Sequence, residues 1–549
     1  MCARISQGPK LRQIEFIFSL VLFALVVGGC STAKRVHKLD RDARKYIELS
    51  RQRALPGQPP EKLDIDHYLE ADQEAFPKRL RLDLRQSLAL AAKHGRDYQT
   101  SKENLYFAAI SVWTTAHEWD WNVSNSLAAV LKRDLDGPDT SLSGDVSLGV
   151  SRRLLSGGRL SVSLAVDSLR YLTGARGVDI MSLAGVTLSQ PLLSGYGPLV
   201  ARESLTQAER DLVYALRSYV RNRKNLLLGV AEKYYAVLSA MDSMEIAERN
   251  DRNLTDSYNR SKLMAEAGRV PPFQVDQARQ DQLSAHSTLV SRQQSFQARK
   301  DELKQTLGIP LRVVLEVDQK DLKRLAQSRL PTPTMAFEVA SQFALDHRLD
   351  YATVLDELAD AERAVKIALD NIRAKLDLEL SGNASSPTDS RFRGIVWDKG
   401  DYSAGFSAEF PFDKTSETAA YKRSLITRAR KRRALSLKRD QIAANLRSDW
   451  RNLKAAEDNY RIQSVSVTLA EKRIESTELL FQAGRVAVRD VLDARNSLIQ
   501  AKNSLTQALV SHRLSWLRLQ YDLERLPTEP ETLWSPALEL ADPGRNEEK

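Results

Sequence analysis

The sequence predicts a mixed α+β fold in which one unit of long helices and amphipathic strands is used twice, as an internal tandem repeat. The turn sequence AGRV occurs at residues 267–270 and again at 483–486, so Gly268 and Gly484 are 484 − 268 = 216 residues apart. Each copy follows a long stretch with helical character. Each of those stretches follows a region in which apolar and polar residues alternate.

The composition is that of a folded protein. Of 549 residues, 42% are hydrophobic and 28% are charged, which argues against disorder and against a polytopic helical membrane protein. The net charge of +10 is spread along the chain, and its densest run is RARKRR at residues 428–433. That run lies in a predicted helix, so a solvated helical face is favoured over a nucleic-acid site.

Residues 1–29 are predicted to be a signal peptide. Lys10 and Arg12 precede an apolar run over residues 16–27, which is shorter than the roughly 20 residues that span a bilayer. The run ends in VGGC, which resembles a bacterial lipoprotein processing site. Cys30 would then be the lipidated first residue of the mature chain, and Ser31 favours the outer membrane. A plain signal peptide is the alternative.

Two segments outside the repeats are predicted to be non-globular. Residues 30–79 are expected to form an extended, lipid-anchored tether because they contain LPGQPPEK. Residues 527–549 lack periodicity and are expected to form a C-terminal tail. Cys2 would leave with the signal peptide, so no disulfide bond is expected within the mature chain.

Alternation of period two predicts strands. It occurs at residues 402–410, 376–381, 146–150 and 160–166, and Trp119 and Trp121 flank Asp120 in another candidate strand. Ser156-Gly157-Gly158 predicts a hairpin turn between two of these runs. No apolar stretch of about 20 residues follows residue 30. If the mature chain crosses a membrane, it must therefore do so as strands of a closed β-barrel.

Two uninterrupted segments, residues 198–265 and 416–482, predict helices of roughly 100 Å. In the first, Leu205, Leu212, Tyr219 and Leu226 recur every seven residues, which is coiled-coil spacing. Helices of this length need neighbouring helices along their length.

The AGRV turns are predicted to reverse the chain. Gly268 and Gly484 suit the left-handed residue that ends a helix. Pro271 and Pro272 fit the start of the next helix, and Asp490 places an acid near the other helix start. Returning helices are predicted at residues 273–307 and 487–523.

The repeat extends upstream of the long helices. HGRDY at residues 94–98 matches HRLDY at 347–351, an offset of 347 − 94 = 253, whereas Pro191 and Pro411 are offset by 411 − 191 = 220. The first repeat, residues 80–310, therefore holds 253 − 220 = 33 residues that the second repeat, residues 311–526, lacks. An extra β-hairpin at about residues 142–170 has the right size.

Over about residues 80–526 the chain resembles the TolC-like outer-membrane efflux channels. The resemblance lies in the duplicated order of elements, the QPLL strand end at residues 190–193, the AGRV turns and DVLDAR at 490–495. It implies a homotrimer that shares one transmembrane β-barrel and continues as a long α-helical coiled-coil barrel through the periplasm. The expected function is a passive exit duct of a tripartite efflux or type I secretion system, with no cofactor and no metal.

The resemblance also implies where partners bind. A periplasmic adaptor protein, attached to an inner-membrane pump, would contact the helical turns at Gly268, Arg269, Val270, Gly484, Arg485 and Val486. Acidic rings that narrow the tunnel fall on Asp490 and Asp493. Some relatives close the tunnel with a Tyr and an acid where this chain has Phe481 and Gln274, so the resting closure is expected to differ.

Two other classes of protein fit the sequence less well. An enzyme is disfavoured because the mature chain has no His-x-x-x-His or Cys-x-x-Cys pair and no Gly-rich phosphate loop after a strand. A lipid-anchored periplasmic adaptor or coiled-coil scaffold without a pore is the main alternative. Adaptors normally carry one helical hairpin between β-rich modules, not a tandem unit.

Overall fold

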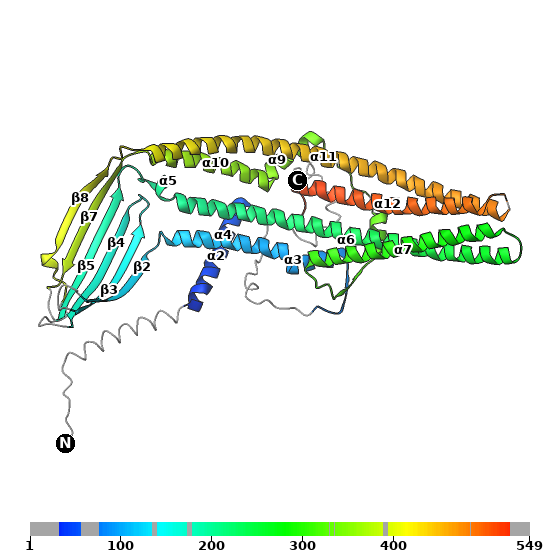
Figure 1. The fold of residues 1–549 in the computed structure, drawn as a ribbon. Coiled ribbons are helices and arrows are strands. Elements are labelled where there is room, and N and C mark those ends of the chain that lie inside the picture. The colour runs from blue at the N-terminus through cyan, green and yellow to red at the C-terminus, as the bar shows by residue number, and fades with distance from the viewer. Residues whose placement is uncertain are drawn as a thin grey trace, which may run out of the picture. The chain divides into compact units, whose positions relative to one another are not determined.

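The computed structural model describes residues 32–55, 76–133, 140–172, 178–328, 330–333, 335–387, 394–483 and 485–527. The chain forms two compact units, and each unit draws on both repeats (Figure 1). The first unit contains the described residues within 1–71, 104–216 and 359–429, and the second contains those within 72–103, 217–358 and 430–549. Cys30, Gly484 and the predicted signal peptide lie outside the described residues.

The order of elements confirms the tandem repeat. The helices are α2 (Thr32–Ala54), α3 (Leu84–His94), α4 (Arg96–His117), α5 (Pro198–Ala201), α6 (Glu203–Glu266), α7 (Pro272–Leu307), α8 (Lys320–Gln327), α9 (Phe337–His347), α10 (Leu349–Asp370), α11 (Thr415–Gln482) and α12 (Val488–Asp522), with a 3₁₀ turn at Trp397–Lys399. The strands are β1 (Arg79–Leu82), β2 (Asn122–Arg133), β3 (Thr140–Arg153), β4 (Arg159–Tyr171), β5 (Val178–Pro191), β6 (Val314–Val317), β7 (Lys375–Ser385) and β8 (Asp401–Glu409). The pairs α3–α4 and α9–α10 are offset by 337 − 84 = 253 residues, as the matched motifs predict.

Among its described residues, the first unit contains one antiparallel sheet of six strands in the order β2-β3-β4-β5-β7-β8. The first repeat supplies β2 to β5 and the second supplies β7 and β8. The two repeats join where β5 pairs with β7, with Leu188 opposite Leu380. The β3–β4 turn packs against the segment that follows β5. A Cβ on Gly157 (φ +95°) would lie 2.4 Å from the carbonyl oxygen of Gly195, so only glycine fits there.

The second unit has its core around a short parallel pair of strands, β1 and β6. Apolar side chains from α3, α6, α7 and α12 pack onto this pair. The largest fully buried side chains of this core are Leu88, Leu227, Tyr234, Tyr235, Leu238, Leu303, Leu307, Leu315 and Leu325. The pair joins the start of one repeat to the start of the other.

The two long helices have 64 and 68 residues, close to the predicted lengths. In α6 the predicted heptad positions Leu205, Leu212 and Tyr219 are buried. At the fourth position the burial has moved from Leu226, which is half-buried, to Leu227. A straight α-helix has 3.6 residues per turn, so a seven-residue stripe drifts by about 20° per heptad and leaves the contact after a few turns.

The expectation that residues 30–79 are extended is wrong for Thr32–Ala54, which form the helix α2. α2 packs on α4 in the first unit. Trp113 Nε1–H donates a hydrogen bond to the carboxylate of Asp42 (3.3 Å), and the Tyr106 hydroxyl donates one to Asp40. Ala43 and Ile47 are buried on the same side. The Pro-containing stretch that suggested a tether begins only after this helix.

The candidate strand at Trp119 and Trp121 is also wrong. α4 ends at His117, and β2 begins at Asn122, so both tryptophans lie in the connection between them. The Asn122 side-chain amide donates to the His117 carbonyl oxygen (3.1 Å), which ties the strand start to the helix end. Alternation over three residues is too short to separate a strand from such a turn.

None of the described helices contains an apolar segment long enough to cross a membrane.

Candidate functional site

The α6–α7 turn confirms the helix-ending role predicted for Gly268. This residue has φ +68°. Its N–H donates to the Ala265 carbonyl oxygen (2.9 Å), and the Arg269 N–H donates to the Met264 carbonyl oxygen (2.8 Å). These bonds satisfy carbonyls that the end of a helix leaves free. α7 then begins at Pro272, where a missing N–H costs nothing.

The α11–α12 turn repeats this hydrogen bonding. The Arg485 N–H donates to the Leu480 carbonyl oxygen (2.9 Å), 480 − 264 = 216 residues after the equivalent bond in the first turn. Gly484, between them, lies outside the described residues. The Ala487 N–H donates to the Asp490 carboxylate (3.0 Å), so Asp490 caps the first turn of α12.

Both turns present similar side chains to solvent. Arg269 and Arg485 are exposed, and Val270 and Val486 are half-buried. Large apolar side chains near the turns are also exposed, namely Leu263, Phe273 and Leu479. The repeated chain reversal therefore produces two surfaces that combine a cation with exposed apolar groups.

The predicted constriction acids lie together on α12. Asp490 and Asp493 are both exposed and are three residues apart, so they share a face of the helix. Asp281 on α7 is close to Asp493. Partial burial and the negative charge of Asp493 raise the pKa of Asp281, and the positive charge of Arg489 opposes this rise. Sequence reasoning missed Asp281 because no motif marks it; only the packing of α7 near α12 brings it to this end.

The arginine that ends each repeated turn motif braces its helical hairpin. Arg495 on α12 forms an ion pair with Glu478 on α11 (2.7 Å). Its equivalent, Arg279 on α7, donates instead to the hydroxyl of Tyr258 on α6 (3.0 Å). An arginine is therefore the donor in both hairpins, but the acceptor is a tyrosine hydroxyl in the α6–α7 hairpin and a carboxylate in the α11–α12 hairpin. Only the interaction in the α11–α12 hairpin depends on the charge of a carboxylate.

Among the described residues of the second unit, two glycines have left-handed backbone conformations, Gly268 and Gly308, and they differ in the space around them. Gly268→Ala is expected to lower the free energy of unfolding by about 1 kcal/mol, because φ +68° is strained for alanine but no atom lies within 4 Å of the added Cβ. Gly308→Ala is expected to lower it further, because its Cβ would lie 2.1 Å from the His94 carbonyl oxygen. Thermal unfolding followed by circular dichroism measures both, and Gly268→Asn should be milder than Gly268→Ala. Equal losses for the two alanine variants would contradict this account.

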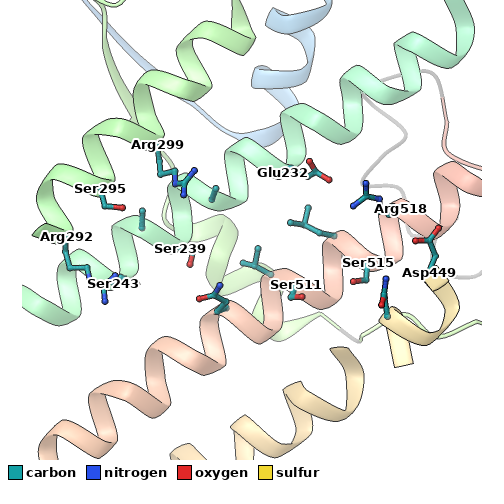
Figure 2. Close-up of a pocket in the computed structure, with 16 residues that line it drawn as sticks. Glu232, Ser239, Ser243, Arg292, Ser295, Arg299, Asp449, Ser511, Ser515 and Arg518 are labelled. Carbon is teal, nitrogen blue, oxygen red and sulfur yellow. The ribbon is translucent and has the colours of Figure 1, made fainter. Parts of the chain in front are cut away.

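A polar groove with a volume of about 590 Å³ lies between the α6–α7 and α11–α12 hairpins (Figure 2). Serines and arginines dominate its wall, and the labelled members are Glu232, Ser239, Ser243, Arg292, Ser295, Arg299, Asp449, Ser511, Ser515 and Arg518. Sequence reasoning missed this groove because its wall comes from four helices and carries no motif. Among the described residues, no group of three or more His, Cys, Asp or Glu could hold a metal ion.

Comparison with known proteins identifies similar sequences. The family described as outer membrane efflux protein matches residues 129–309. The outer membrane protein TolC of Vibrio cholerae serotype O1 is 24% identical over 351 residues, which cover 62% of this chain and 76% of TolC. The alkaline protease secretion protein AprF of Pseudomonas aeruginosa is 22% identical over 334 residues, which cover 60% of this chain and 68% of AprF.

Solved structures share the fold. CusC, whose structures concern transmembrane channel formation, superposes with a TM-score of 0.60 and 16% identity over 83% of this chain and 95% of CusC. The MtrE outer membrane channel of Neisseria gonorrhoeae superposes with a TM-score of 0.59 and 14% identity over 81% of this chain and 90% of MtrE. At these identities the superpositions establish the fold and not the cargo.

Proposed function

This chain is a TolC-like outer membrane factor, and from that premise we propose that it is the trimeric exit duct of a tripartite efflux or type I secretion system. Three copies share one transmembrane β-barrel, and their helices form a coiled-coil tunnel in the periplasm. A lipid on Cys30 anchors each copy to the outer membrane. The duct supplies no energy and opens when a periplasmic adaptor, joined to an inner-membrane pump, engages the helical turns.

The exposed apolar face of the sheet carries this proposal. Val123 on β2 and Tyr402 on β8 are 70% and 74% exposed, and apolar residues continue across the strands between them. Soluble monomers rarely expose an apolar surface of this extent, whereas a transmembrane barrel turns such a band toward lipid. Among the described residues, β2 and β8 each pair with a strand on one side only. In lipid their free backbone groups need partners, which neighbouring copies supply.

The paired turns support adaptor docking. Each combines an exposed arginine with exposed apolar side chains at a helical end of the second unit. Because the turns of the two repeats have matching hydrogen bonds, one adaptor surface can bind both turns of each copy. Gly268, Arg269 and Val270 form one proposed contact surface, and Gly484, Arg485 and Val486 form the other.

A carboxylate ring at the tunnel end is expected to bind multivalent cations. Replacing Asp490 and Asp493 together with Asn should weaken the block of single-channel current by a trivalent cation by about tenfold or more, because six carboxylates (2 × 3) are lost from a trimer. Asparagine keeps an oxygen that can accept from the Ala487 N–H, so the helix cap is largely retained.

The matched control replaces Asp440 and Asp458, two exposed acids on α11, with Asn. The control should leave the block unchanged. An unchanged block in the Asp490→Asn/Asp493→Asn variant would remove these residues from the constriction while leaving the channel itself intact.

The second candidate function is a lipid-anchored periplasmic adaptor or scaffold without a pore. Planar bilayers discriminate between the two directly. Purified full-length protein should give long-lived conductance steps if it is a channel, and a scaffold should give none.

A further inference from the structure

All six strands of the sheet share one apolar face. One row of directly opposed residues crosses the whole sheet, from Val123 on β2 to Tyr402 on β8; its members are Val123, Val150, Val162, Val186, Gly382 and Tyr402. The Tyr402 ring covers Gly382, where an added Cβ would lie 3.0 Å from it. The row is therefore apolar from one edge of the sheet to the other.

The neighbouring row points to the opposite face and is small or polar throughout. Its members are Ser124, Gly149, Ser163, Gly185, Asn383 and Asp401. Side chains alternate between the two faces of a sheet along each strand. The sheet therefore has one face suited to lipid and one suited to water, and neither is interrupted at β3 or β4.

The additional hairpin of the first repeat, β3–β4, is thus a full part of the wall. β3 pairs with β2 over residues 140–151 and with β4 over residues 141–153. Its turn is fixed at the base of the sheet, where the Gly197 N–H donates to the Ser156 carbonyl oxygen (3.0 Å) and the Gln190 side-chain amide donates to the same oxygen (3.1 Å). A hairpin lying outside a barrel would have no reason to keep the apolar register of the other strands.

On the basis of the trimeric channel proposed above, we infer that the edge strands β2 and β8 bind each other between copies and close a barrel of 18 strands (3 × 6). Two strands per repeat, as the second repeat provides, would give only 12 (3 × 4). The count of six per copy is even, so β8 of one copy runs antiparallel to β2 of the next, as closure requires.

The larger count widens the pore. Barrel diameter grows roughly linearly with strand number, so 18 strands give about 1.5 times the width of 12. With a strand spacing of about 4.8 Å and a tilt of about 40°, the backbone diameters are roughly 36 Å and 24 Å. A barrel of this size holds an open aqueous channel, as porins of 16–18 strands do. The limit on cargo size then lies in the helical tunnel and not in the outer membrane.

Cysteine cross-linking tests the strand order in the full-length protein in outer membranes. Pairs that join Val123→Cys or Leu127→Cys to Tyr402→Cys or Phe406→Cys should yield disulfide-linked trimers on non-reducing gels. Ser126→Cys/Ser147→Cys is the positive control, because these residues are opposed within one copy and their hydroxyl oxygens are 2.6 Å apart. It should form a bond that leaves the chain monomeric on the gel.

Two further cysteine pairs test the alternative in which the β3–β4 hairpin lies outside the barrel wall. Val123→Cys/Val186→Cys forms only if β3–β4 leaves the sheet and β2 pairs with β5. Leu164→Cys/Phe406→Cys forms between copies only if β4 becomes the edge. Either rival bond, or a positive control that forms without any β2–β8 bond, overturns the inference.

End-on electron micrographs of the purified trimers provide a second readout. A barrel about 36 Å wide would support the inferred number of 18 strands, and a barrel about 24 Å wide would contradict it. Conducting trimers with the narrow barrel would overturn this inference alone. Absence of both trimers and conductance would instead overturn the proposed channel.

Discussion

Arg348→Met is expected to lower the free energy of unfolding by about 3–5 kcal/mol, the usual loss when one partner of a buried ion pair is removed. Arg348 is only 4% exposed. Its guanidinium forms two hydrogen bonds with the carboxylate of Asp350 (3.0 and 2.9 Å) and one with Asp522 (2.9 Å). Methionine fills a similar volume but leaves two partly buried carboxylates without this donor.

The surrounding network makes the loss large. Burial alone would favour the neutral form of Asp350, yet hydrogen bonds from Arg348 and Lys438 hold its pKa well below its ordinary value. Arg221 approaches Asp350 and Asp522 as well, at 3.4 and 3.7 Å. The network joins α6, α10, α11 and α12 within the second unit, so its disruption affects the packing of several helices at once.

Unfolding in detergent, followed by tryptophan emission, measures the effect, because Trp450 and Trp516 lie in the adjacent apolar cluster. Arg461→Met is the matched control. Arg461 pairs with Glu457 at 3.4 Å on the exposed side of α11, and such pairs contribute about 0–1 kcal/mol. The double variant Arg348→Met/Asp522→Asn should lose less than the sum of its single variants. A loss for Arg348→Met as small as for Arg461→Met would show that the network does not stabilise the fold.

The charge network around Arg348 could not be predicted from the sequence, although the duplicated backbone that carries it could. The 253-residue offset places Arg348 opposite Gly95 of the first repeat, and the 216-residue offset places Glu524 opposite Gly308. Gly308 and Glu524 both adopt left-handed backbone conformations, with φ +73° and +60°. The duplicated backbone was therefore predictable. The replacement of two glycines by an arginine and a glutamate that enter one charge network was not, because it depends on contacts between distant segments.

Glu524 shows how that replacement is tolerated. A left-handed conformation costs a non-glycine residue about 1–2 kcal/mol. The carboxylate of Glu524 accepts hydrogen bonds from Lys224 (2.9 Å) and Arg221 (2.8 Å), and Lys224 also donates to the Glu524 carbonyl oxygen (2.8 Å). These charge-assisted bonds offset the strain. Sequence reasoning locates a chain reversal by its glycine. It therefore misses the reversal at Glu524, which ion pairs stabilise instead.

Elements with local signals were predictable, and elements defined by packing were not. The long helices and the Gly268 turn follow from periodicity and from glycine conformation, which are properties of neighbouring residues. The helix α2 was missed because a Pro-containing stretch nearby suggested an extended chain. The place of Asp281 beside Asp493 was missed because it requires α7 and α12 to be positioned in space.

Asp449→Asn is expected to stabilise the protein at pH 8 and to remove part of its pH dependence. Asp449 on α11 is buried, and one of its carboxylate oxygens has no hydrogen-bond partner among the described residues. Burial and a hydrogen bond with the Asp522 carboxyl raise the pKa of Asp449 to about 7, and the positive charges of Arg518 and Arg348 only partly oppose this rise. Figure 2 shows Asp449 and Arg518 at one end of the polar groove.

The direction in which stability changes with pH follows from proton binding. The folded state holds this proton up to about pH 7, whereas an unfolded aspartate releases it near pH 4. Between these pH values the folded state binds more protons, so stability falls as the pH rises. Above pH 7 both states are ionised, and the folded state keeps a carboxylate facing a second carboxylate. Asparagine does not titrate and can donate a hydrogen bond to Asp522.

The difference in unfolding free energy between Asp449→Asn and the parent chain should therefore grow from pH 4 to pH 7 and level off at about 1–3 kcal/mol in favour of the variant. Urea unfolding at a series of pH values measures it, and the subtraction cancels groups that titrate alike in both proteins. Asp458→Asn, an exposed acid on the same helix, should show no such growth. If Asp449→Asn destabilises the chain equally at every pH, its carboxyl is ionised and satisfied in the folded protein. Because the groove wall includes Asp449, the predicted result would also mean that its local charge changes across the neutral pH range.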